Sequence, residues 1–148
     1  MLTNMTGRIL MLLSIAAFAR AEFLRVDVAI RDMNCEPCSQ SLQSALERMR
    51  GVEKVEVDFK TAVVRVKLSE KTRLGIDQVW DAIKRVGFTP GETTVTVRGA
   101  VHGSKLEVPE TGKTFTIDGR VTEGDSVEVT GAITPPPDPR TPIVIRVK

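Results

Sequence analysis

The chain has 148 residues, 41% of them hydrophobic, with 21 basic and 19 acidic side chains. A formal net charge of +2 without a basic patch argues against a nucleic-acid-binding protein. The two cysteines, Cys35 and Cys38, are three positions apart, and a disulfide between them would close a loop too small to stabilise a fold. The chemistry of the two sulfurs is therefore the better reason for the pair.

Residues 1–21 have the features of a secretory signal peptide. Arg8 gives a positive start, Ile9–Ala19 is an apolar stretch, and Ala19-Arg20-Ala21 is a small-residue cleavage site. The apolar stretch is about 11 residues long, whereas a membrane-spanning helix needs about 20. We therefore expect cleavage after Ala21, a mature chain that begins near Glu22, and a periplasmic or secreted protein. An uncleaved N-terminal anchor is the alternative.

Removal of residues 1–21 would change the charge and the redox setting of the protein. Arg8 and Arg20 are the only charged side chains in that segment, so the mature chain would carry 19 bases and 19 acids. Export would place the cysteines in an oxidising compartment, where a Cys-x-x-Cys pair can be held as a disulfide.

The segment after the signal peptide changes from strand to helix periodicity. Leu24–Ile30 alternates apolar and polar residues, which predicts a half-buried strand. From Cys38 the apolar residues recur on one face of a helix. Pro37 suits the first helical turn, and Gly51 is predicted as the residue that follows the C-cap. The apolar face comprises Cys38, Leu42, Ala45, Leu46 and Met49.

Four further elements complete a recognisable order. They are strands over Val55–Phe59 and Val64–Leu68 joined at Lys60-Thr61, a helix over Ile76–Val86 closed by Gly87, and a strand over Thr93–Val97. The resulting βαββαβ order is the split-βαβ, ferredoxin-like plan. We predict an α+β fold with a ferredoxin-like sandwich over residues 22–98.

Residues 99–148 lack helical periodicity and contain short strand-like runs separated by turn signals. The runs are Lys105–Val108, Thr114–Ile117, Ser126–Ile133 and Ile143–Val147, with a proline-rich loop at Pro135–Pro139. Such spacing predicts a small all-β, barrel-like unit, with loose similarity to oligonucleotide-binding-type barrels. About 50 residues make a marginal core, so we expect this unit to lean on the first domain or on a partner. A strand at Thr93–Val101 could run through both units.

The cysteines lie where the first strand gives way to the first helix, which suits either a soft-metal clip or a redox couple. Met33-Asn34-Cys35-Glu36-Pro37-Cys38 on a βαββαβ frame resembles the heavy-metal-associated domain family. Residues 51–66 are similar to the second and third strands of that family, and residues 82–88 to its second helix and the following loop. The family includes copper chaperones, N-terminal domains of metal-transporting P-type ATPases, and periplasmic mercury-binding proteins.

The resemblance implies a metal site at Cys35 and Cys38, with Met33 and Phe88 in supporting positions. In the family the matching Met packs inward and anchors the loop, and the matching Phe shields the metal. Thiolates select soft ions, so Cu(I) or Hg(II) is the expected cargo, and two sulfurs can complete the site of either ion. The start of a helix should favour the thiolate form, whereas the carboxylate of Glu36 opposes it.

Zinc is disfavoured as the cargo. Zinc generally takes four ligands, and the nearest candidates beyond the sulfurs are Asp32 and Glu36. Zinc-preferring members of the family tend to carry a carboxylate where this chain has Asn34. The family pattern also has a Gly where Asp32 stands, and Glu36 and Pro37 are uncommon between its cysteines. His102, the single histidine, is interpreted as a solvated turn residue.

The leading hypothesis is an exported protein that binds Cu(I) or Hg(II) and delivers it by thiolate exchange to a transporter. The expected partner is a metal-transporting membrane protein or P-type ATPase, and membrane contact would come only through the signal peptide or that partner. Such a carrier has no catalytic residues and is not an enzyme. One alternative is a periplasmic thiol-disulfide oxidoreductase, because Cys-x-x-Cys at a helix start is also the thioredoxin arrangement. Another is an envelope interaction module with a sensory metal domain.

Overall fold

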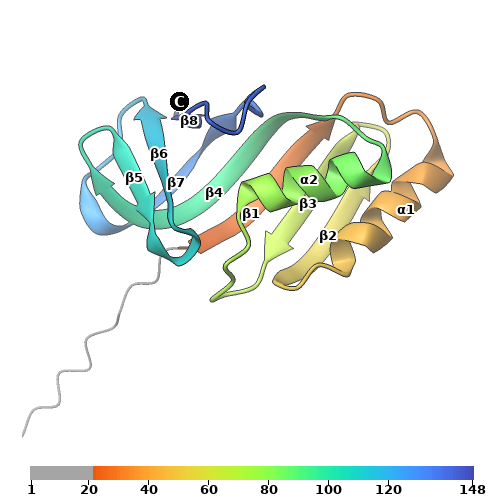
Figure 1. Cartoon of the computed structure of the whole chain (residues 1–148), viewed down its shortest axis with the longest axis horizontal. Coiled ribbons are helices and arrows are strands. Elements are labelled where there is room, and N and C mark those ends of the chain that lie inside the picture. Colours follow the sequence, from red (N-terminus) through yellow and green to blue (C-terminus); the bar gives the residue numbers. More distant parts are fainter. Residues whose placement is uncertain (1–21) are drawn as a thin grey trace, which may run out of the picture.

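The structure, a computed structural model, describes residues 22–148, and the predicted signal peptide lies outside these residues. Eight strands, two α-helices and one short 3-10 helix follow one another in this part of the chain (Figure 1). In chain order they are β1 (Glu22–Ile30), α1 (Glu36–Glu47), β2 (Val52–Asp58), β3 (Val63–Leu68), α2 (Ile76–Val86), β4 (Pro90–His102), β5 (Lys105–Val108), η1 (Pro109–Thr111), β6 (Lys113–Asp118), β7 (Gly124–Ile133) and β8 (Val144–Arg146).

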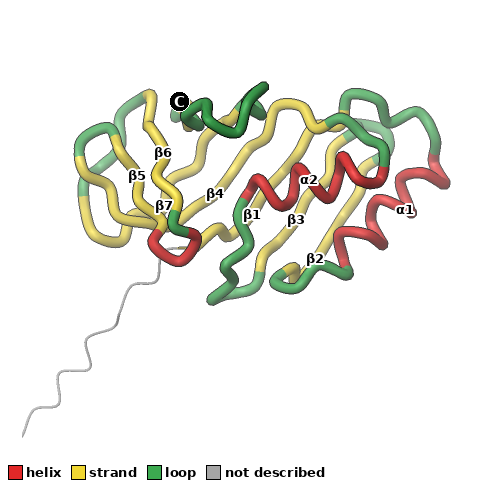
Figure 2. Tube along the Cα trace, in the orientation of Figure 1, coloured by secondary structure: helices red, strands yellow, loops and turns green. Residues whose placement is uncertain are grey.

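The first six elements form the predicted ferredoxin-like arrangement. Strands β2, β3, β1 and β4 are hydrogen-bonded neighbours in that order, and each adjacent pair is antiparallel. Helices α1 and α2 lie side by side across one face of these strands (Figure 2). The loops β1–α1, β2–β3 and α2–β4 consequently meet at one end of the sheet, because successive elements alternate in direction. The ferredoxin-like part of the predicted fold class is confirmed.

Strand β4 is the longest element and connects the two halves of the chain. Over Pro90–Arg98 one of its edges pairs with β1, and over Ala100–His102 the same edge pairs with β5. Its other edge pairs with β7 over Thr93–Val101. The strand therefore passes through residue 98 without interruption, as the sequence allowed.

The strands of the C-terminal half pair in a closed cycle. From β4 the neighbours are β5, β6, β8 and β7, and β7 returns to β4. All these pairs are antiparallel except β6 with β8, which are parallel. The four short runs predicted after residue 98 thus all occur as strands, and β4 supplies the fifth member of the cycle.

One hydrophobic core extends through both halves. Val26 of β1, Val66 of β3 and Ile83 of α2 are fully buried in the first half, and Leu106 and Ile145 are fully buried in the second. These side chains belong to a single contiguous cluster. The C-terminal half therefore packs against the ferredoxin-like half and shares its core, as expected for a unit of its size.

Two details of the sequence prediction are wrong. Helix α1 ends at Glu47 with Arg48 as its C-cap, so Gly51 lies in the following turn, where its φ of 100° uses the left-handed region. Phe59, predicted as the last residue of a strand, follows the end of β2 and is 39% exposed. The strand stops at Asp58 because its carboxylate accepts the backbone N–H groups of Lys60 and Thr61 and starts the turn.

None of the helices within residues 22–148 is long and apolar enough to cross a membrane.

Candidate metal centre

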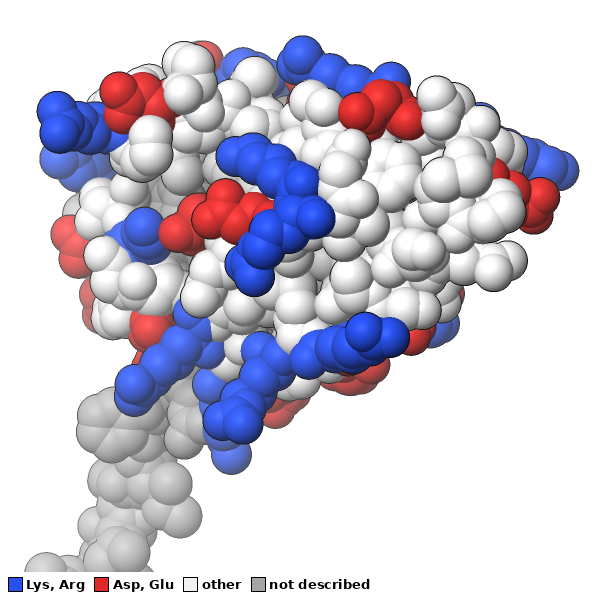
Figure 3. All heavy atoms as spheres, turned by 45° about the vertical axis from the view of Figure 1, so that its right-hand side comes forward, with Lys and Arg blue, Asp and Glu red and all other residues white. Residues whose placement is uncertain are grey.

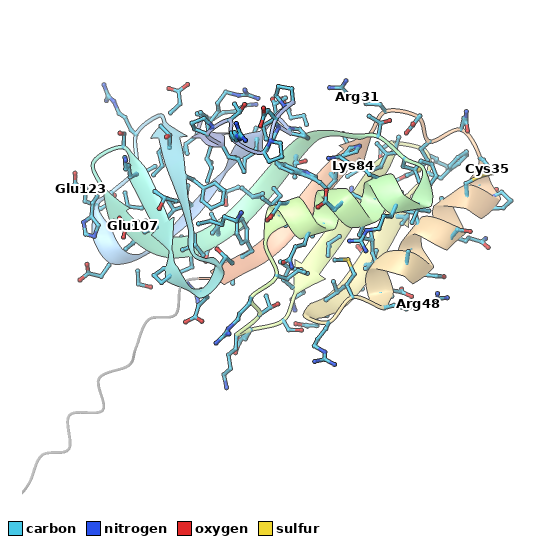
Figure 4. All side chains as sticks on the ribbon, in the orientation of Figure 1. Arg31, Cys35, Arg48, Lys84, Glu107 and Glu123 are labelled. Carbon is cyan, nitrogen blue, oxygen red and sulfur yellow. A yellow bond between two sulfur atoms is a disulfide. The ribbon has the colours of Figure 1, made fainter. Side chains whose placement is uncertain are left out.

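Cys35 and Cys38 form a disulfide at the start of α1, with their Cα atoms 5.1 Å apart. Cys35 is the N-cap residue, in an extended conformation, and Cys38 lies in the first turn of the helix. Figure 4 places Cys35 at one extremity of the molecule, with Arg48 at the other end of the same helix. Glu107 and Glu123 lie at the opposite extremity, in the C-terminal half. The sulfur pair is thus presented on the outside of the ferredoxin-like half.

The helix start directs backbone N–H groups toward the first cysteine. Cys38 N–H donates to Cys35 Sγ at 3.3 Å, and Ser39 N–H donates to the carbonyl oxygen of Cys35 at 3.2 Å. The Ser39 hydroxyl donates to the carbonyl oxygen of Glu36 at 2.6 Å. A helix N-terminus carries partial positive charge and stabilises an anion beside it. The backbone at Cys35 is therefore arranged to support a sulfur that carries negative charge.

A surface hollow lies beside the sulfurs, between the start of α1 and the end of α2. Residues of the β1–α1 loop, of α1 and of the α2–β4 loop contribute to it: Asp32, Asn34, Cys38, Ser41, Val86, Gly87 and Phe88. Cys38 is half-buried, while the Phe88 side chain is 9% exposed and belongs to the hydrophobic core. The α2–β4 loop thus brings an aromatic ring to the hollow that Cys38 lines.

Met33 lies in the β1–α1 loop and Phe88 lies in the α2–β4 loop. Met33 is half-buried and packs against the hydrophobic core. Phe88 reaches the site because Gly87 ends α2 in the left-handed region, with a φ of 102°, and turns the chain toward the sheet. His102, in contrast, ends β4 far from the pair, with its side chain 60% exposed and Asp125 at 3.9 Å.

Asp32 joins the two loops that border the hollow. Its Oδ1 accepts the backbone N–H of Thr89 at 2.9 Å, and its Oδ2 accepts the Thr89 hydroxyl at 2.9 Å. The hydrogen bond from the Thr89 backbone holds the pKa of the Asp32 carboxyl below its ordinary value. The partner of Asp32 thus lies 57 positions away in the chain, in the other loop.

The charge around the site is mixed. Arg31 lies in the β1–α1 loop and Lys84 lies on α2, on the same side of the molecule as Cys35 (Figure 4). Figure 3 shows acidic and basic side chains interspersed over the face that it draws, with lysines and arginines gathered along its lower edge, away from the end that carries Cys35. Among residues 22–148, no three His, Cys, Asp or Glu side chains come together as a metal-binding cluster.

Comparison with known proteins agrees with this geometry. Residues 27–89 match the heavy-metal-associated domain. Over 61 residues the chain is 33% identical to the copper chaperone CopZ of Staphylococcus haemolyticus (strain JCSC1435), a match that covers 41% of this chain and 88% of that protein. The chain belongs to the heavy-metal-associated domain family. The resemblance carried by Met33, the two cysteines and the Gly87-Phe88 loop is therefore confirmed.

Several solved structures are also similar to part of this chain. A CopZ metallochaperone is 24% identical and covers 45% of this chain and 97% of its own, with a TM-score of 0.42. Oxidised MerP from Ralstonia metallidurans CH34 is 22% identical, with 46% and 93% covered and a TM-score of 0.43. A copper-binding domain from the P-type ATPase HMA7 is 22% identical, with 49% and 92% covered and a TM-score of 0.43.

Thr89 is the residue of this site that the sequence did not reveal. Nothing in its immediate neighbourhood marks it, because its role depends on contact with a distant loop. The predicted topology contained a usable signal, since the β1–α1 and α2–β4 loops of a βαββαβ fold lie at the same end of the sheet. A polar residue in each of those loops, Asp32 and Thr89, could then have been paired.

Proposed function

We propose that this heavy-metal-associated domain protein is an exported carrier of a soft metal ion, Cu(I) or Hg(II). Cys35 and Cys38 bind the ion as thiolates, and the chain passes it to a metal-transporting membrane protein such as a P-type ATPase. The observation that carries the proposal is the cysteine pair at the exposed start of α1, beside the Phe88 loop. The carrier makes and breaks only metal–sulfur bonds and is not an enzyme.

The ligand chemistry favours a soft ion over zinc. Thiolates bind Cu(I) and Hg(II) strongly, and these ions accept two sulfur ligands, whereas structural zinc takes four ligands. Both oxygens of Asp32, the carboxylate three residues before Cys35, already accept hydrogen bonds from Thr89. A zinc ion at Asp32 would compete with these two hydrogen bonds for the carboxylate.

Metal binding uses the dithiol form of the pair. Two equivalents of an external thiol reduce the Cys35–Cys38 bond and leave as their own disulfide. Each cysteine then loses its proton when the metal binds. During transfer a thiolate of the partner adds to the ion, giving a three-coordinate intermediate, and a thiolate of this chain then leaves. The half-buried sulfurs are open to such an incoming ligand.

The direct test is anaerobic titration of the reduced chain with Cu(I) and with Hg(II), in competition with a chelator of known affinity. We expect tight one-to-one binding that Cys35→Ser and Cys38→Ser each weaken by more than about a hundredfold, since loss of outer hydrogen-bond partners alone costs about 10–100-fold. Ser41→Ala is the matched control, because Ser41 lines the same hollow without supplying a sulfur. Absence of tight binding by the reduced wild-type chain would refute the proposal.

Met33 tests whether the site has a third sulfur ligand. Its half-burial against the core supports a packing role. Met33→Leu keeps a similar volume and removes the thioether, so metal affinity should change by less than about threefold, with a stability cost below about 1.5 kcal/mol. A larger loss of affinity with unchanged stability would make Met33 a ligand.

A thiol-disulfide oxidoreductase is the second candidate, because the structure contains the disulfide with Cys35 at a helix N-terminus. Its ferredoxin-like strand order differs from that of thioredoxin, which makes this reading the weaker one. Catalytic reduction or isomerisation of a protein disulfide, abolished by Cys35→Ser, would favour it over the carrier.

Export and the role of the C-terminal strands complete the proposal. The predicted signal peptide supports a periplasmic or secreted location, and N-terminal sequencing of the expressed protein should find a chain that starts near Glu22.

The closed cycle of β4 to β8 supports a barrel-like unit that spaces or docks the metal domain. In an envelope interaction module, surface changes on that unit would abolish partner binding while metal affinity stays constant.

A further inference from the structure

A carboxylate bridge links the metal loop to the loop that carries Phe88. Asp32 lies in the turn that follows β1, and Thr89 lies between Phe88 and the start of β4. The Asp32 carboxylate accepts both the backbone N–H and the hydroxyl of Thr89. In the reverse direction, the backbone N–H of Arg31 donates to the carbonyl oxygen of Thr89 at 3.1 Å. Three hydrogen bonds therefore converge on one residue of the second loop.

The bridge lies at the border of the hollow beside the sulfurs. Asp32 and Phe88 both line that hollow, together with Cys38. The ends of the two loops are fixed by the sheet, because Ile30 pairs with Pro90. Beyond this pair the loops diverge, one toward Cys35 and the other toward α2. The Asp32–Thr89 bridge connects the two loops through side chains at the point where they separate.

We propose that Asp32 is a positioning residue of the metal site, which holds the metal loop against the Phe88 loop and thereby slows the release of the bound ion. The inference rests on the proposed carrier function. Asp32 acts through Thr89 and not as a ligand in this proposal, since each of its oxygens accepts a hydrogen bond from Thr89. Its effect is on the geometry of the loop that presents Cys35 and Cys38 and on access to the hollow.

The expected consequence follows from the mechanism of transfer. An incoming thiolate must reach the ion and form a three-coordinate intermediate, which requires the loop beside the hollow to give way. While the bridge is intact, the metal loop and the Phe88 loop move together. Without it, the metal loop moves by itself, so ligand exchange becomes faster and the two-sulfur site is less well ordered.

The test is the rate at which the reduced, Cu(I)-loaded full chain transfers its ion to an excess of a coloured Cu(I) chelator. Asp32→Ala should raise this rate by about tenfold, the lower end of the effect of removing hydrogen bonds that orient metal ligands. Asp32→Asn keeps an oxygen for the Thr89 N–H and should restore most of the wild-type rate. Thr89→Val removes only the hydroxyl and should give an intermediate rate.

Asp58→Ala is the matched control. Asp58 is a turn carboxylate whose Oδ1 accepts two backbone N–H groups, from Lys60 and Thr61 in its own hairpin. Its loss should lower the thermal unfolding midpoint to a similar degree as Asp32→Ala and leave metal release unchanged. This separates positioning of the site from a general loss of stability.

The outcomes distinguish failure of the carrier function from failure of the positioning role of Asp32. If wild type fails to bind Cu(I), the carrier function falls and the bridge's role falls with it. If wild type binds Cu(I) and Asp32→Ala releases it at the wild-type rate, or Asp58→Ala accelerates release equally, only the positioning role of Asp32 is overturned. Faster release in Asp32→Ala, with recovery in Asp32→Asn, supports it.

Discussion

The ring of Phe23 meets the ring of Phe115 edge to face, with their centroids 5.6 Å apart and their planes at 84°. Phe23 lies on β1 and Phe115 on β6, so the contact joins the ferredoxin-like half to the C-terminal half. Both side chains are 1% exposed. Edge-to-face aromatic pairs add to the stability that burial of the rings provides. The two halves should consequently unfold together.

Phe115→Ala tests this coupling. Truncation of a buried Phe costs about 3–5 kcal/mol, and here the loss should reach the first half through Phe23. The single tryptophan, Trp80, lies on α2 and reports on the ferredoxin-like half alone. Denaturant unfolding followed by Trp80 fluorescence should therefore shift to lower denaturant. Phe59→Ala, at an exposed position, is the control and should change little. An unchanged Trp80 transition in Phe115→Ala would show that the halves are independent.

Trp80 and Thr93 form a buried hydrogen bond that secures α2 to β4. The indole N–H of Trp80 donates to Thr93 Oγ1 at 3.0 Å, and the Thr93 hydroxyl donates to the carbonyl oxygen of Gly91 at 3.0 Å. Thr93→Val keeps the shape and leaves the indole N–H without a partner, which should cost about 1–3 kcal/mol. Urea unfolding measures the loss, with Thr94→Val on the exposed face of β4 as the control. Equal stability of the two variants would contradict the assigned role.

The sequence predicts best the elements that bury one face in the core and expose the other face to solvent. Helix α2 was predicted over Ile76–Val86 with Gly87 as its end, and the structure has these bounds. Its apolar residues recur with the helical period because one face packs on the sheet. Gly87 comes directly after α2 because helices commonly end in a residue with left-handed backbone angles, and this residue is usually glycine. Local pattern and local geometry carry the same information in this element.

The features that the sequence did not reveal depend on contacts between distant segments. The alternation of apolar residues predicts which face of β4 is buried. It does not predict that β7 pairs with the edge of β4 opposite β1. Phe59 continues the apolar alternation of β2, yet the turn set by Asp58 places it outside the strand. The contact of Asp32 with Thr89 likewise requires the position of two loops, which a short window of sequence does not contain.

Gly99 is predicted to be required where β4 exchanges one neighbour for another. The strand pairs with β1 up to Arg98 and with β5 from Ala100. A Cβ at position 99 would meet the carbonyl oxygen of Glu107 and lie 2.9 Å from Leu106 Cδ1, both closer than real side chains approach. Gly99→Ala should therefore destabilise the chain by about 1–3 kcal/mol, the usual cost of overpacking.

Thermal unfolding followed by circular dichroism measures the effect of Gly99→Ala. Thr94→Ala, on the exposed face of the same strand, is the control and should stay near wild type. Wild-type stability of Gly99→Ala would mean that β5 can move away from β4 at no cost, which would contradict a tightly packed junction between the halves.

Asp58 is expected to make stability depend on acid pH. Hydrogen bonds from Thr61, together with one from the backbone of Lys60, lower the pKa of the Asp58 carboxyl in the folded chain. A folded pKa below the unfolded value, which is about 3.9, means that the charged carboxylate stabilises the fold. This contribution is present in full above the unfolded pKa and is lost as the pH falls through the folded pKa.

The thermal midpoint of wild type should therefore exceed that of Asp58→Asn near pH 6, and the difference should shrink toward about pH 2. Thr94→Ala removes no titratable group, so its difference from wild type should stay constant over the same range. A difference for Asp58→Asn that stayed constant or grew toward acid pH would show that the Asp58 charge does not stabilise the hairpin.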